Sequence, residues 1–236
     1  MIRESFHFRE TFATILAEDP AHAAAAKAGM LSARQVLEAY IARDPFFAVT
    51  FDPYEPDSDE LVITRMAAAA RRAGVGPMAA VAGTIAWAGV EAMGEAGASF
   101  AVIDNGGDIA LVSDRPVRVG VHAGGAALSN RVAFVVPPQE KILGICTSSA
   151  TVGPSVSFGM ADAVTIFSRD MSLADAWATS VCNQIRPDDR SVLERVDPSE
   201  VSGIFAIMGD LTVRWGELPP LVPAFVDEQL ISAGDR

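Results

Sequence analysis

The chain has 236 residues and a formal net charge of −12, because 30 acidic side chains outnumber 18 basic ones. No continuous stripe of Lys and Arg is present, which argues against binding to nucleic acid or to an anionic membrane surface. Its two cysteines lack the spacing of a zinc site or a disulfide framework, and it starts without a signal-like segment, so we expect a cytoplasmic protein with one compact domain over residues 1–236.

An Ala-rich helix is predicted early in the chain. Asp19-Pro20 ends a strand-like segment over residues 6–16, and the helix follows it through about Arg43. Residues 46–51 favour another strand. The acidic segment 52–60 that follows is the one part of the chain with the composition of a disordered loop.

Two further helices are expected next. One covers residues 59–72 and ends at Gly74, a residue that terminates helices readily. The other covers residues 77–94 and contains Gly83 and Gly89, each of which costs roughly 1 kcal/mol relative to Ala inside a helix. We therefore expect another helix or a ligand to approach the backbone closely at both glycines.

Strands dominate the remainder. The expected ones are residues 99–103, 109–113, 117–121, 132–136, 142–147, 163–167, 204–208 and 211–215, the first four forming an antiparallel meander. A helix is expected from Ser172, its cap, to Ile185, and the Pro-rich tail should lie across the surface. Most connections are too short for a helical crossover, so the predicted class is α+β, a mainly antiparallel sheet packed with helices, either as one unit or as two intimately packed halves.

A turn rich in glycine separates two of these strands. Asn105, Gly106 and Gly107 are typical of an ordinary hairpin, and from the residues alone that is the favoured interpretation. Paired glycines also let a flat ligand or a phosphate approach bare backbone amides, and Asp108 would then be the polar group beside it.

Asp175 and Thr179 are four positions apart on the late helix and therefore share one face. A carboxylate and a hydroxyl are hard oxygen ligands, which suit Mg²⁺ better than zinc. The alternative is a surface Asp beside a Thr that packs into the core.

A stretch of small hydroxyl residues follows Cys146. Thr147, Ser148 and Ser149, with Thr151 and Gly153 beyond them, either present hydroxyls and amides to a phosphate or form an ordinary polar connection. Cys146 itself is either a buried, inert thiol or a nucleophile.

Together these stretches resemble the ApbE-like family, which comprises flavin transferases and an uncharacterised cytoplasmic branch. The similarity to that branch is the greater, through V-G-P-M-A-A-V-A-G, N-G-G-D, G-I-C-T-S-S and A-D-x-x-x-T, and it covers roughly residues 74–185. The resemblance implies an ApbE-like fold with a pocket for FAD or a related nucleotide and Mg²⁺.

The same resemblance assigns roles to residues. The expected metal ligands are Asp175 and Thr179, the expected cofactor-binding residues are Gly76, Met78, Asn105, Gly106, Gly107, Thr147, Ser148 and Ser149, and the catalytic candidates are Asp108 and Cys146. Two departures from the transferases stand beside these matches. Val75-Gly76 lacks the lysine of their K-G motif, and residues 157–162 lack the histidine of their H-x-x-D-P segment.

Three functions remain open at this point. The first is Mg²⁺-dependent binding of FAD or a related nucleotide, with transfer of FMN or hydrolysis of FAD. The second is a cytoplasmic enzyme of sulfur or small-molecule metabolism that uses Cys146, and the third is a non-catalytic flavin-binding accessory protein. We also expect a homodimer, from the Ala-rich helices, and no nucleic-acid or membrane partner.

Overall fold

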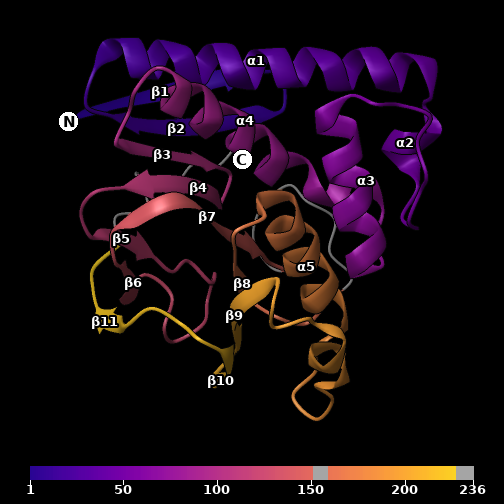
Figure 1. Ribbon diagram of the computed structural model, residues 1–236. Coiled ribbons are helices and arrows are strands. Elements are labelled where there is room, and N and C mark those ends of the chain that lie inside the picture. The colour runs from indigo at the N-terminus through magenta and orange to yellow at the C-terminus, as the bar shows by residue number, and fades with distance from the viewer. Residues whose placement is uncertain (151–158, 227–236) are drawn as a thin grey trace.

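The computed structural model of the chain describes residues 1–150 and 159–226. A sheet of eight antiparallel strands forms its centre, with helices on one face and a sheet of three strands on the other (Figure 1). This is the α+β, mainly antiparallel class that the sequence predicts.

The large sheet comprises β1 (Ile2–Phe8), β2 (Thr11–Ala17), β3 (Phe100–Asn105), β4 (Asp108–Ser113), β7 (Gln139–Ser148), β8 (Ala163–Ser168), β9 (Val201–Met208) and β10 (Leu211–Gly216), in this spatial order. The small sheet comprises β5 (Val117–Gly120), β6 (Val132–Val136) and β11 (Leu221–Pro223), with β6 in the middle. The helices are α1 (Pro20–Arg43), α2 (Phe46–Val49), α3 (Leu61–Ala73), α4 (Val81–Glu95) and α5 (Met171–Gln184), with 3-10 turns η1 (Pro77–Ala80) and η2 (Ser191–Arg195).

The first elements match the prediction in part. The strand expected over residues 6–16 is a hairpin of β1 and β2 that turns at Arg9, whose φ is 51°. The Ala-rich helix follows as expected, and Asp19 caps it, because its Oδ1 accepts a hydrogen bond from the backbone N of Ala21 at 2.7 Å. The strand expected over residues 46–51 is wrong, since Phe46–Val49 form the short helix α2 and Phe47 packs into the core at 5.1 Å from the Tyr40 ring.

The helix predicted over residues 77–94 divides into η1 and α4, and both of its glycines lie where other elements come close. A Cβ on Gly83 would lie 2.8 Å from the carbonyl oxygen of Met171 on α5. A Cβ on Gly89 would lie 2.8 Å from Met30 Cγ on α1. The protein itself therefore supplies the close approach that the sequence predicts at these positions.

Side chains alternate across the large sheet and divide the core in two. The helical face carries residues such as Ile103, Ala110 and Cys146. The opposite face meets the small sheet, where the Phe134 ring lies 5.0 Å from Phe167 and 5.5 Å from Phe205. The predicted meander of four strands is wrong after β4, because β5 and β6 belong to the small sheet and β4 pairs with β7.

Among the helices in the described part of the chain, none is by itself long and apolar enough to cross a membrane. The bent pair Leu61–Ala73 and Pro77–Glu95, which meet at 105°, reaches that length and composition only when taken together.

Candidate functional site: two buried carboxyl groups

The hairpin between β3 and β4 places two polar residues at one end of the sheet. Asn105 and Asp108 pair directly across it, and the two central residues, Gly106 and Gly107, have φ values of 68° and 101°. A two-residue turn of this kind needs positive φ at both central positions. Asp104 closes the turn, since its Oδ1 accepts a hydrogen bond from the backbone N of Gly107 at 2.9 Å. The turn geometry alone accounts for both glycines.

Asn105 and Asp108 face the helices. The Asn105 side chain donates a hydrogen bond from Nδ2 to the carbonyl oxygen of Ala82, at the start of α4, over 2.9 Å. Asp108 lies opposite Cys146 of β7, which also belongs to the helical face. The end of this face therefore brings together an amide, a carboxyl group and a thiol.

The second carboxyl group comes from α5. Asp175 is 8% exposed, and its Oδ2 accepts a hydrogen bond from the backbone N of Gly83 at 2.8 Å. The first amides of a helix have no partner within it, so Asp175 caps α4 from a neighbouring helix. Ser172 contributes a second contact, with its Oγ 2.7 Å from Thr84 Oγ1, and is not the cap of α5 that we predicted.

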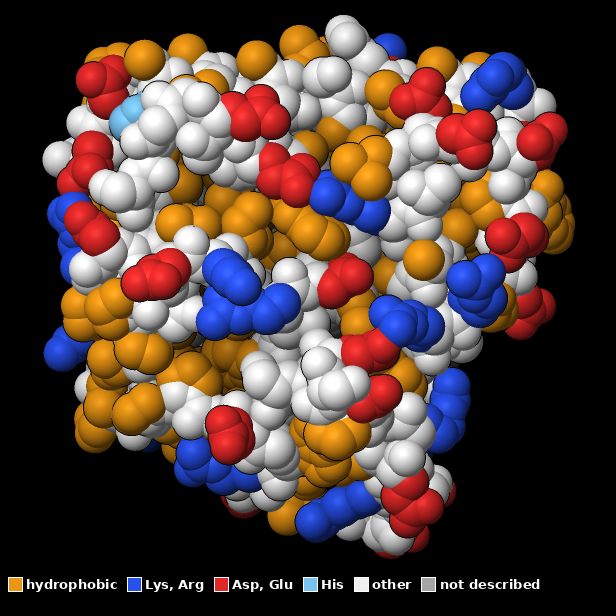
Figure 2. Space-filling view, in the orientation of Figure 1, with side chains coloured by type: hydrophobic (Ala, Val, Ile, Leu, Met, Phe, Trp, Pro, Cys, Tyr) orange, Lys and Arg blue, Asp and Glu red, His pale blue; other side chains and the backbone are white. Residues whose placement is uncertain are grey.

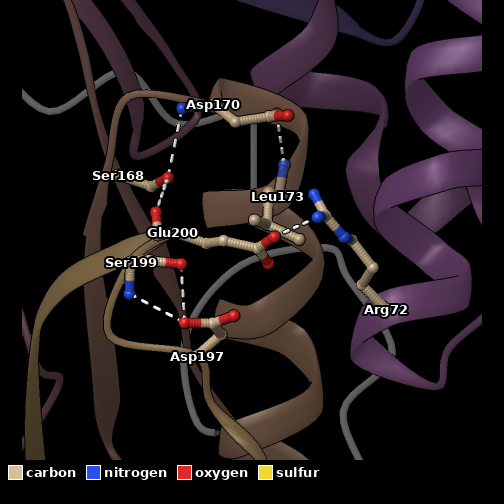
Figure 3. A network of polar contacts seen from close by, with 7 residues as sticks. All are labelled: Arg72, Ser168, Asp170, Leu173, Asp197, Ser199 and Glu200. Atoms are coloured by element: carbon tan, nitrogen blue, oxygen red, sulfur yellow. Dashed lines mark hydrogen bonds and ion pairs between the residues drawn. The ribbon is translucent and has the colours of Figure 1, made fainter.

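A polar network holds the first turn of α5 in place (Figure 3). Asp170 caps the helix by accepting a hydrogen bond from the backbone N of Leu173 at 2.9 Å. The Ser168 hydroxyl donates to the carbonyl oxygen of Glu200 at 2.5 Å and accepts from the backbone N of Asp170 at 3.1 Å. Arg72 of α3 forms an ion pair with the Glu200 side chain. Three separate segments thus fix the helix that carries Asp175.

Burial dominates the electrostatics of the two carboxyl groups. It raises the pKa of Asp108 well above its usual range, and the charge of Asp175 raises it further, although hydrogen bonds from the Cys146 side chain and the Thr147 backbone to this carboxyl group act to lower it. Burial also raises the pKa of Asp175 to about 7, although hydrogen bonds from the Gly83 and Ala82 amides act to lower it. Within the described residues, Asp108 Oδ1 is a buried oxygen without a hydrogen-bond partner. Because an unpaired buried acceptor is costly, a proton or a cation at this oxygen would stabilise the pair.

Cys146 is fully buried beside these groups. Its Sγ lies 3.7 Å from the carbonyl oxygen of Met171, to which it donates. Burial, followed by the charges of Asp108 and Asp175, raises the pKa of the thiol well above its usual range. A thiol in such surroundings stays protonated at neutral pH, and these are the properties of the inert alternative.

The other predicted residues are more dispersed. Gly76 is buried against the end of α2, where a Cβ would overlap the carbonyl oxygen of Thr50, so packing alone explains this glycine. Met78 is partly buried against the helical core. Thr179 is partly buried one turn beyond Asp175 on α5.

The hydroxyl stretch after Cys146 does not form one surface. The Thr147 hydroxyl lies 3.0 Å from that of Thr165, and since neighbours on a strand face opposite sides, it points away from the carboxyl groups. Ser148 is partly buried and Ser149 is 9% exposed. Thr151 and Gly153, together with residues 157–158 of the segment without the family histidine, lie outside the described residues.

The sequence groups Asp108 and Asp175 in one predicted site, but it does not identify the Gly83 amide as the partner of Asp175. The signal for that partner is the start of α4, where Ala80 provides no side-chain cap. A helix without its own cap needs an acceptor from elsewhere. Within residues 1–150 and 159–226, no three His, Cys, Asp or Glu side chains converge as a metal-binding group, so any cation here would rest on two carboxylates and other oxygens.

Solved structures identify the class of this fold as that of the ApbE flavin transferases. The apo crystal structure of the Pseudomonas stutzeri flavinyl transferase ApbE superposes with a TM-score of 0.56, covering 99% of this chain and 98% of that one at 13% sequence identity. The flavin transferase ApbE from Vibrio cholerae gives a TM-score of 0.55, covering 91% and 96% of the two chains at 12% identity.

Sequence comparisons then identify the family. The family profile described as AbpE bacteria matches residues 3–213. A UPF0280 protein of Methanoregula boonei is 72% identical over 100% of both chains, and one of Methanoculleus marisnigri is 61% identical over 99% of this chain and 96% of its own. The chain belongs to the AbpE bacteria family and is a relative of the UPF0280 proteins, which confirms the ApbE-like resemblance seen in the motifs.

Proposed function

We propose that the chain binds FAD, or a related nucleotide, together with Mg²⁺ where Asp108 and Asp175 meet. The observation that carries this proposal is the pair itself, in which two carboxyl groups are buried together and Asp108 Oδ1 has no partner among the described residues. A cation between them would relieve the repulsion of like charges and pair the buried oxygen that lacks a partner.

The donor set fits Mg²⁺. This ion commonly uses one or two carboxylates and completes its shell with water and phosphate oxygens, so a third acidic side chain is not required. Asp175 and Asp108 would hold it, with the Thr179 hydroxyl one turn further along α5. When bound, Mg²⁺ would neutralise charge on the pyrophosphate of the nucleotide.

The chain's own residues keep the site in position. Asn105 ties the hairpin to the start of α4 through Ala82, and Asp175 ties the same turn of α4 to α5 through Gly83. Because each contact comes from a different element, the two carboxyl groups are held in place before a ligand arrives. Such support is what an efficient binding site requires.

The family supports a flavin-related function, since the fold is shared with flavin transferases. Both FMN transfer to a hydroxyl and hydrolysis of FAD by water break the bond between the two phosphates and release AMP. The absence of the lysine and the histidine of the transferases' motifs counts against transfer to a protein hydroxyl. The order of our proposal is therefore nucleotide binding first and pyrophosphate cleavage second.

Titration calorimetry of FAD, with Mg²⁺ and with EDTA, tests the binding. We expect Mg²⁺-dependent binding that weakens by about tenfold or more in Asp108→Asn and Asp175→Asn. Asp188→Asn is the matched control, because Asp188 is exposed and should bind as the unaltered chain does. Absence of binding in the presence of Mg²⁺, or equal binding by all variants, would overturn the proposal.

Chromatographic detection of AMP in the same mixtures separates the remaining functions. Release of AMP indicates cleavage, whereas tight binding without AMP indicates the accessory protein. Cys146→Ser should bind FAD and form AMP as the unaltered chain does, because a buried protonated thiol is a poor nucleophile. A folded Cys146→Ser variant that binds FAD but forms no AMP, where the unaltered chain forms it, would give Cys146 a part in the cleavage. No binding of FAD with or without Mg²⁺ would move the hypothesis of a sulfur or small-molecule enzyme to first place.

A further inference from the structure

A group of large apolar side chains is exposed at the end of the molecule where α2 lies. Phe46 is 57% exposed, Val49 65%, Phe51 69% and Leu61 58%. We call these four residues the α2 patch. Single exposed apolar residues are ordinary, but several large ones gathered in a short stretch indicate a contact surface.

The α2 patch has a supported shape. Phe47 lies fully buried beneath it, and the Phe46 ring packs 5.4 Å from the Tyr54 ring. Through Tyr54 the segment 52–60, predicted as disordered from its composition, lies against α2, and an ion pair between Glu55 and Arg71 of α3 holds it further. A surface formed in advance loses little entropy when a partner binds.

The border of the α2 patch is acidic. From Asp44 to Glu60 the sequence has six acidic residues and no Lys, Arg or His. Five of them are exposed, namely Asp52, Glu55, Asp57, Asp59 and Glu60. Along the edge of the molecule where α2 and α3 are found, apolar and acidic side chains lie next to each other, with Lys or Arg side chains also among them (Figure 1, Figure 2).

The apolar patch and its acidic border together indicate which kind of partner would bind there. A second copy would cover the apolar side chains but would bring two acidic borders together, on chains that each carry a net charge of −12. A basic amphipathic segment matches both properties, because its apolar side chains meet the patch and its Lys and Arg meet the border. We propose that the α2 patch docks a basic amphipathic segment of another protein.

The position of the patch places such a partner close to the start of α4. The carbonyl oxygen of Thr50, the residue after α2, packs against Gly76. Gly76 leads through η1 into the first turn of α4, which holds the Gly83 amide bonded to Asp175. A protein docked on the α2 patch would therefore contact the element that packs against the segment leading into the carboxyl site.

Fluorescence anisotropy with three labelled helical peptides tests the proposal on the full chain. One peptide is an amphipathic Leu/Lys helix, the second replaces Lys by Glu, and the third replaces Leu by Gln while keeping Lys. We expect the Leu/Lys peptide alone to bind, and its affinity to fall by about tenfold or more in the double variant Phe46→Ser, Phe51→Ser. Phe225→Ser is the control, since Phe225 is 90% exposed elsewhere and should leave binding unchanged.

Three results would overturn the proposal. Equal binding of the Gln-containing peptide would mean that bulk charge attracts it, and unchanged binding by the double variant would place the contact elsewhere. Sedimentation equilibrium supplies the third, since a dimer that dissociates in the double variant would make a second copy the occupant. Thermal unfolding of the double variant should show at most a small loss of stability, because both side chains are largely exposed and the contact of Phe46 with Tyr54 is the main one lost.

Discussion

Replacing Asp175 by Asn removes one of the two buried carboxyl groups while keeping the size of the side chain. The amide oxygen can still accept the hydrogen bond from the Gly83 backbone N, and the amide NH₂ offers a donor to the carboxyl group of Asp108. We expect this variant to be more stable than the unaltered chain at alkaline pH in the absence of Mg²⁺. Gain of stability on removing a polar residue is typical of sites kept for function.

The magnitude follows from the pKa of Asp175. Burial raises it from 3.8 to about 7, so the folded chain holds this proton more tightly than the unfolded chain. The protonated Asp175 therefore stabilises the folded chain fully when the pH is below the pKa of this group in the unfolded chain. This stabilisation is lost as the pH rises through its pKa in the folded chain, and the free energy of unfolding is lower by about 4 kcal/mol at pH 8. Allowing for a weaker hydrogen bond to Gly83, we expect Asp175→Asn to gain about 2–4 kcal/mol at pH 8 and almost nothing at pH 4.

Urea and thermal unfolding between pH 4 and pH 8, at fixed ionic strength and with EDTA, measure this difference. At pH 8 the gain corresponds to a rise in Tm of about 4–16 °C for a chain of this size. Asp188→Asn, at an exposed position, should leave the pH dependence unchanged. An Asp175→Asn variant that is less stable at every pH, or whose advantage does not grow with pH, would refute a raised pKa at this residue.

Four other experiments test the packing around the site and between the two sheets. Gly83→Ala should separate α4 from α5 and lower the free energy of unfolding in urea by about 1–3 kcal/mol. Gly94→Ala on the same helix, where a Cβ meets nothing within 4 Å, should raise it by up to about 1 kcal/mol. A smaller loss at Gly83 than at Gly94 would contradict the close contact of Gly83 with α5. Asp170→Ala should cost about 1 kcal/mol through loss of the α5 cap, and no change would show that the network of Figure 3 does not depend on it. Cys146 should react with a thiol reagent only at the rate of unfolding, so rapid labelling of the native chain would contradict its burial. Phe134→Ala should cost about 3–5 kcal/mol because it opens the contact between the sheets, and a loss below about 1 kcal/mol would contradict that role.

Local signals in the sequence predict local structure well. Asp19-Pro20 marks the start of α1, and Gly74, with a φ of 70°, marks the end of α3. These features depend on a few adjacent residues and on the chemistry of helix ends. The strand predicted over residues 46–51 fails because its aromatic content is typical of strands, while a helix of four residues is too short to show a periodic pattern.

The same local signals do not predict which distant strands pair with each other. The partnership of β4 with β7 passes over β5 and β6, and no residue in β4 indicates that its neighbour is more than twenty positions away. The resemblance to a family brings Asp108 and Asp175 into one list of site residues, but only the folded chain shows that the charge of one raises the pKa of the other. Burial is a property of the assembled layers, so its effect on these groups could not be predicted from spacing.

The two edges of the large sheet limit how copies of the chain can associate. β1 and β10 each have one neighbour in the sheet, and each exposes charged side chains, Arg3 on the first and Arg214 on the second. A strand from another molecule that extended either edge would have to strip water from those charges, which discourages continuous sheets between molecules. The homodimer expected from the sequence would accordingly have to form through side chains on a helical or a small-sheet surface, and its symmetry axis would lie away from the ends of the sheet.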